Sequence, residues 1–117
     1  MNVGVNGSTA IMSLRLQKRA NTIYSPQITL TSETSVSISG TSYKLPAGAE
    51  IELLHRRPLG GAIVVVVIDD VAYRVLWQER DSVDMVVDPS AVTTTWVHAE
   101  PLNTYLLSLP AKYTASV

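Results

Sequence analysis

Two apolar segments separated by two aspartates limit the folds open to this chain more than any other feature. Residues Ala62–Ile68 are uninterrupted apolar side chains, and Val71–Gln78 follow directly after Asp69 and Asp70. Most of these side chains are β-branched or aromatic, types that pack well on a pleated sheet, and the β-branched ones lose rotamer freedom in a helix. Two such segments joined by two residues predict an antiparallel β-hairpin.

The two-residue turn predicts which side chains lie opposite each other. One face is assigned to the core, packed against Ile51 and Leu53, and its expected pairs are Ile68 with Val71, Val66 with Tyr73, Val64 with Val75 and Ala62 with Trp77. The other face is still mostly apolar, although a sheet with one wet face would carry polar residues there. We therefore expect the N-terminal segment, the C-terminal segment or a second copy of the chain to cover it. The predicted interface residues are Ile63, Val65, Val67, Arg74 and Leu76.

The composition supports the same bias over the whole chain. Its 117 residues include 15 Val, 7 Ile and 11 Thr, with no Phe and no Cys. This length suits one domain with one core, and the lack of Cys excludes disulfides and Cys-based metal sites. The longest apolar run, Ala62–Ile68, is far shorter than the roughly 20 residues of a transmembrane helix. Since the first residues also lack a secretory pattern, we expect a cytoplasmic protein, in the host cytoplasm if the chain is viral.

The N-terminal part carries two overlapping patterns. Apolar side chains recur at helical spacing within residues 8–24 and predict a short helix there: Met12, Leu16, Ala20 and Ile23. Strict alternation of Met12, Leu14 and Leu16 leaves a strand over residues 10–16 as the alternative. We expect Pro26 to end either element.

From Gln27 onward the apolar period is two. It predicts strands around Ile28 and Val36 and over Glu50–His55 and Val92–His98, while Pro101 opens a short C-terminal helix. The predicted fold is mainly β, a small antiparallel barrel or sandwich with a short N-terminal helix. Residues 1–26 form the lead-in and helix, and residues 27–117 form a single β-rich domain. By parity the aromatic residues belong mostly to the core, with one or two as exposed anchors of an interface: Tyr43, Tyr73, Trp77, Trp96 and Tyr105.

Residues 45–83 resemble the bacterial SH3-like barrel. The resemblance consists of a Pro-Ala-Gly turn at Pro46, a strand that ends in Leu53 and Leu54, a polar loop with Gly, and a hairpin with Tyr73 and Trp77 in its second strand. It covers about 39 of the 117 residues. Such barrels usually act as binding modules, so the resemblance implies an SH3-like fold and a binding role.

Basic residues suggest one ligand site. His55, Arg56 and Arg57 open a loop that ends in two glycines, and paired guanidiniums can clamp a phosphate or carboxylate. Arg15 and Arg19 join this site if the N-terminal segment packs nearby. The alternative is that all these charges are solvated. A net charge of −1 and a pI near 6.0 argue against a dedicated nucleic-acid binder.

Catalytic and metal sites are not indicated. His98 and Glu100 are too few for a zinc shell, and with 23 Ser plus Thr but two His a catalytic triad can be drawn at will. We expect no cofactor.

The leading hypothesis is a non-enzymatic interaction module that binds a protein partner or itself. An anion, nucleotide or nucleic-acid binder is the alternative, and a small hydrolase assembled across a dimer is the third. Small Cys-free chains without enzyme motifs are common among phage proteins, including inhibitors of host defence and virion assembly parts.

Overall fold

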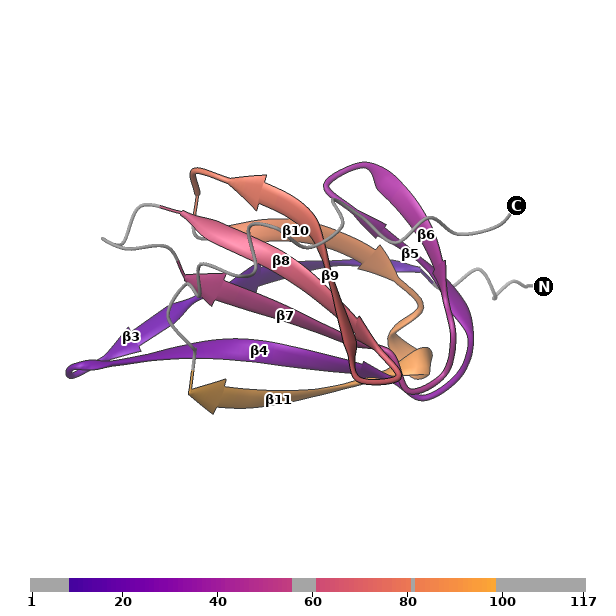
Figure 1. Ribbon diagram of the computed structural model, residues 1–117, viewed down its shortest axis with the longest axis horizontal. Helices are drawn as coiled ribbons and strands as arrows, with labels where there is room; N and C mark the ends of the chain where they lie inside the picture. The colour runs from indigo at the N-terminus through magenta and orange to yellow at the C-terminus, as the bar shows by residue number, and fades with distance from the viewer. Residues whose placement is uncertain (1–8, 56–60, 81, 99–117) are drawn as a thin grey trace.

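The chain folds into two antiparallel β-sheets packed face to face (Figure 1). The computed structural model describes residues 9–55, 61–80 and 82–98. The four-stranded sheet has the order β2 (Ala10–Arg15), β10 (Ser82–Val87), β5 (Thr34–Ile38) and β6 (Thr41–Leu45). The six-stranded sheet has the order β11 (Val92–His98), β4 (Thr22–Leu30), β7 (Glu50–His55), β8 (Ala62–Ile68) and β9 (Val71–Gln78), and β3 (Gln17–Arg19) pairs with β4. The prediction of a mainly β fold is confirmed, and its two antiparallel sheets agree with a sandwich or barrel-like form.

The prediction of an N-terminal helix is wrong. Residues 10–24 form β2, β3 and the start of β4, and β2 pairs with β10 from Arg15 opposite Ser82 to Ala10 opposite Val87. The alternating pattern predicts the structure correctly, because Leu14 and Leu16 are buried while Ser13 and Arg15 are exposed. Pro26 lies inside β4 and does not end it. The predicted C-terminal helix lies outside the described residues.

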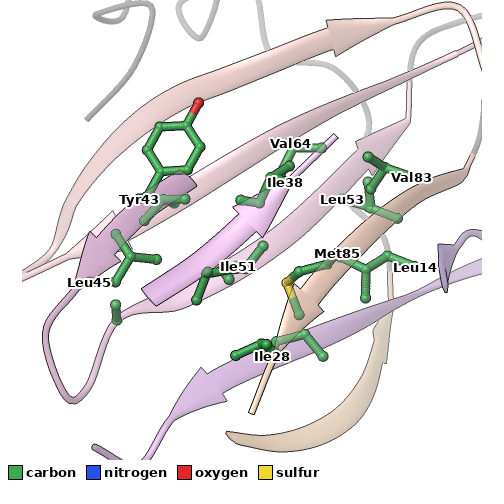
Figure 2. Close-up of a cluster of buried hydrophobic side chains, with 14 of the residues drawn as sticks. Leu14, Ile28, Ile38, Tyr43, Leu45, Ile51, Leu53, Val64, Val83 and Met85 are labelled. Atoms are coloured by element: carbon green, nitrogen blue, oxygen red, sulfur yellow. The ribbon is translucent and has the colours of Figure 1, made fainter. Parts of the chain in front are cut away.

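Alternating side chains from both sheets form the main core between them. Figure 2 shows this cluster, which includes Leu14, Ile28, Ile38, Tyr43, Leu45, Ile51, Leu53, Val64, Val83 and Met85. In β7 the inward residues are Ile51 and Leu53, as the alternation predicted, whereas Leu54 faces the other side and belongs to a second cluster. The core thus follows the period-two pattern of the sequence.

The hairpin of β8 and β9 begins with the predicted register. Ile68 pairs with Val71, Val66 with Tyr73, and Val65 with Arg74. Both turn residues have positive φ, 52° at Asp69 and 67° at Asp70, as a type I′ hairpin turn requires. The turn prediction is therefore confirmed.

Beyond Val65 the register shifts by one residue. Val64 pairs with Leu76 and Ile63 with Trp77, so Val75 is an extra residue on β9 of the kind that makes a β-bulge. The predicted pairs of Val64 with Val75 and of Ala62 with Trp77 are therefore wrong. As a consequence Leu76 packs against the main core, while Trp77 is 37% exposed and is not the buried residue that parity predicted.

Candidate interaction surface

The face of the six-stranded sheet that points away from the main core is called here the outer face. The registers of β7, β8 and β9 arrange its side chains in rows across the three strands. The rows are Leu54, Ile63 and Trp77, then Glu52, Val65 and Arg74, then Glu50, Val67 and Ala72. The bulge brings Trp77 to this face in place of Leu76.

A small second cluster fills the middle of the outer face. Leu54, Ile63 and Val65 are buried, and Val67 and Ala72 are half-buried against them. Ile63 is 0% exposed and Val65 is 2% exposed. Of the five residues predicted to form an interface, the accessible ones on this face are therefore Val67 and Arg74, both half-buried. Leu76 packs on the opposite side of the sheet.

The charged side chains that flank Val65 both have neighbours that hold them. Glu52 Oε2 accepts a hydrogen bond of 3.0 Å from Gln27 Nε2 on β4. The Arg74 guanidinium lies 6.0 Å from the centre of the Trp77 ring, at the limit of a cation–π contact. Arg74 and Trp77 thus lie close together at the β9 edge of the outer face.

A depression of about 250 Å³ lies where β4, β7 and β11 meet. Its lining includes Ser25, Gln27, Glu52, Val97 and His98. The Ser25 hydroxyl accepts a hydrogen bond of 3.3 Å from the backbone N–H of Leu53, and Gln27 donates to Glu52. The backbone pairing of β4 with β7 covers Ile28 with Ile51 and Thr29 with Glu50. Beyond these pairs, the two side-chain hydrogen bonds join the strands. The hydrogen bonds of Ser25 and Gln27 therefore have a structural role.

The exposed large hydrophobic residues share one structural property. Ile11 is 71% exposed, Val71 49%, Trp96 48% and Trp77 37%. Ile11 lies on β2, Val71 and Trp77 lie on β9, and Trp96 lies on β11. All three strands are edge strands of their sheets within the described residues. The sequence predicted mostly core aromatic residues with one or two exposed anchors, and Trp77 and Trp96 are the exposed ones. The assignment of Trp77 in particular to the core face of the hairpin is wrong.

The five residues of the predicted ligand site are only partly described. Arg15 is exposed at the end of β2, in the four-stranded sheet, and Arg19 is exposed on β3, in the six-stranded sheet. The Arg19 guanidinium donates to Gln17 Oε1 at 3.4 Å and lies 5.9 Å from the centre of the Tyr24 ring. His55 ends β7, and Arg56 and Arg57 lie outside the described residues. Anion binding by this set stays a prediction.

Across residues 9–55, 61–80 and 82–98, no group of three or more His, Asp or Glu side chains is placed to hold a metal ion. The described part of the chain has no helix that is long and apolar enough to cross a membrane. No protein-family model, curated protein or solved structure matches the chain. The SH3-like resemblance of residues 45–83 stays a prediction.

Proposed function

We propose that this chain is a non-enzymatic interaction module that binds protein through the edge strands of its two sheets. The observation that carries the proposal is the placement of Ile11, Val71, Trp77 and Trp96, the large hydrophobic residues with the most exposure among those described. Each lies on an edge strand, β2, β9 or β11.

Edge strands suit this role for two physical reasons. In general, an edge strand has a row of backbone N–H and C=O groups on its outer side, with which an extended segment of a partner can pair. A tryptophan next to such an edge supplies a large apolar anchor, the residue type that most often dominates binding energy at interfaces. By contrast, the polar side chains of the depression near Ser25 bond to one another and to the backbone. The edge strands are therefore better suited than the depression to bind a partner.

The proposal is tested by immobilising the full chain and its variants and exposing them to an extract of the organism that encodes it. Trp77→Ala and Trp96→Ala each remove an exposed anchor from one edge. Asp84→Ala on β10 is the matched control, because Asp84 is exposed on a strand in the interior of its sheet. A protein retained by the wild type is then purified, and its dissociation constant is measured against all three variants.

Binding through the edges predicts a dissociation constant at least about tenfold weaker for one of the tryptophan variants and unchanged for Asp84→Ala. If every retained protein binds the tryptophan variants as tightly as the wild type, the edge strands are not the binding surface. Circular dichroism of each variant checks that the fold is intact, which we expect because both tryptophans are exposed.

A further inference from the structure

Strand β11 differs from the other sheet edges in what its sequence contains. Its seven residues are Val-Thr-Thr-Thr-Trp-Val-His, with no Asp, Glu, Lys, Arg, Pro or Gly. Residues 93–96 are all exposed, and three of them are threonines. Natural edge strands usually carry a charge, a proline or a bulge that prevents pairing with another strand. None of these features is present in β11.

The other three end strands of the two described sheets each carry such protection, and the three-residue β3, which pairs with β4 alone, carries Lys18 and Arg19. On β9 the register shift at Val75 and the neighbouring Arg74 interrupt the edge. On β6, a strand of five residues, Lys44 is exposed. On β2 the exposed Arg15 ends the strand, and the chain leaves the sheet at the next residue. The edge of β11 is therefore the least protected of these edges.

The geometry of β11 is also regular over its full length. It pairs with β4 at all seven positions, from Val92 opposite Leu30 to His98 opposite Tyr24, with no shift of register. In an antiparallel strand of this kind, alternate residues direct their N–H and C=O groups away from the bonded neighbour. The outer side of β11 thus presents a straight row of backbone donors and acceptors, and no described strand pairs with it.

We propose that β11 pairs antiparallel with β11 of a second copy of this chain, about a twofold axis at Thr95, so that the two six-stranded sheets become continuous. This inference rests on the proposed function, which is binding through strand edges, and it identifies the partner as a second copy of the chain. A twofold axis perpendicular to the sheet keeps the same face of both copies on the same side, so residues of equal parity must oppose each other. Centring it on Thr95 satisfies this rule and pairs all seven residues.

The strand is complementary to itself in this register. Thr95 lies opposite its own copy, Trp96 opposite Thr94, Thr93 opposite Val97, and Val92 opposite His98. Threonine pairs and aromatic pairs with a β-branched residue are favourable across strands, and no like charges meet. The two Trp96 rings lie on one face at diagonal positions, within reach of each other. Pairing therefore removes from water an indole that is 48% exposed in the single chain.

The contact is small, because a single seven-residue edge buries less than the roughly 1,600 Å² of a standard interface. We therefore expect a dimer that dissociates on dilution, with a dissociation constant on the order of micromolar. Sedimentation velocity of the full chain over a concentration series measures this equilibrium directly. Amide hydrogen exchange of β11 at low and high concentration identifies the strand involved.

Charge substitutions at Thr95 test the register. In Thr95→Lys two like charges meet on the twofold axis, so the dimer should weaken at least about tenfold, and Thr95→Glu should behave in the same way. An equimolar mixture of the two variants places opposite charges there and should restore dimers of mixed composition. Thr41→Lys is the matched control on the β6 edge, since Thr41 is also an exposed strand threonine, and it should dimerise as the wild type does.

Three results would overturn the inference. The first is a wild type that is monomeric at every concentration. The second is a wild-type dimer that neither Thr95→Lys nor Thr95→Glu weakens relative to Thr41→Lys. The third is protection of alternate β11 amides that does not change with concentration, which means that another part of the same chain occupies the edge. The first two leave the proposed function untouched, because binding of a different protein through Trp77 or Trp96 is measured separately. The third removes β11 from the edges available for that function and leaves those of β2 and β9.

Discussion

Replacing Ser25 with Ala should destabilise the protein by much more than an ordinary serine substitution. Ser25 is 1% exposed and is the buried polar side chain among the described residues. Its hydroxyl accepts a hydrogen bond of 3.3 Å from the N–H of Leu53 and lies 3.3 Å from the carbonyl of Pro26. Proline has no N–H, so the strand ladder is weakened at this point. The backbone pairing of β4 with β7 covers only Ile28 with Ile51 and Thr29 with Glu50, and the serine oxygen gives the Leu53 N–H an acceptor outside that pairing.

The magnitude follows from what Ser25→Ala leaves behind. The methyl group fits in the space of the hydroxymethyl group, so the loss of packing is small. The N–H of Leu53, itself a fully buried residue, is left without this acceptor, and a buried donor in that state costs about 1–3 kcal/mol. We expect the free energy of unfolding to fall by about 2 kcal/mol.

Urea denaturation measures this loss, and hydrogen exchange at the Leu53 amide shows its location. The matched control is Ser42→Ala on β6, because Ser42 is exposed and its substitution should change stability by no more than about 0.5 kcal/mol. If Ser25→Ala and Ser42→Ala have the same stability and the Leu53 amide stays protected, the serine oxygen is not the acceptor that holds β7 to β4.

Three further predictions concern the hairpin and the core. Trp77→Ala should cost only about 1 kcal/mol, whereas Ile51→Ala at a fully buried position should cost about 2–5 kcal/mol in the same urea assay. Asp70→Gly should raise the melting temperature, with a gain of up to about 1 kcal/mol, because Gly adopts the positive φ of this turn without strain. Burial raises the pKa of the Tyr43 hydroxyl above its ordinary value of 10.0. The neutral Tyr43 hydroxyl therefore makes its full contribution to the free energy of unfolding below pH 10. That contribution is lost as the pH rises through the higher pKa of the folded state. Tyr43→Phe should remove this alkaline loss in denaturation curves measured from pH 8 to pH 12.

Period-two patterns in the sequence predicted most of the inward-facing residues correctly. Ile28, Val36, Ile51 and Leu53 are all buried, as their alternation with other side chains indicated. The pattern works because each of these strands buries one face against the other sheet, so side-chain parity and burial coincide. The same logic predicted the first half of the β8 and β9 hairpin, up to Val65 opposite Arg74.

The pattern failed where two periods share the same residues. Met12 and Leu16 fit a helical spacing, but with Leu14 they also fit an alternating one, and local spacing alone did not choose between them. The choice depends on β10, about 70 residues later in the chain, which pairs with β2 along its whole length. A contact between distant segments overrides a local preference in such cases.

The bulge in β9 shows a second limit of parity. Up to Arg74 the alternation of the sequence and that of the structure agree, and from Leu76 onward they are opposite, because Val75 adds one residue to β9 without a partner on β8. One residue is enough to exchange the two faces. Leu76, the more apolar side chain at this end, thereby reaches the main core, and Trp77 is moved to the outer face. Packing of the half-buried Leu76 against the main core in place of Trp77 gives a physical reason for the bulge, which no local sequence motif predicts.

The candidate surface was harder to predict than the core, because it depends on strand order rather than on side-chain parity. Parity states which side of a sheet a residue faces, but it does not state whether its strand has one neighbour or two. Val92–His98 has the composition of an ordinary strand, and its exposed Trp96 becomes informative only because β4 is the one described strand beside it. At an edge, the lack of charge in this strand means that nothing in its sequence opposes pairing with another strand. A central strand needs no protection against pairing, whereas an unprotected edge favours it, and this difference turns a neutral segment into the candidate for self-association.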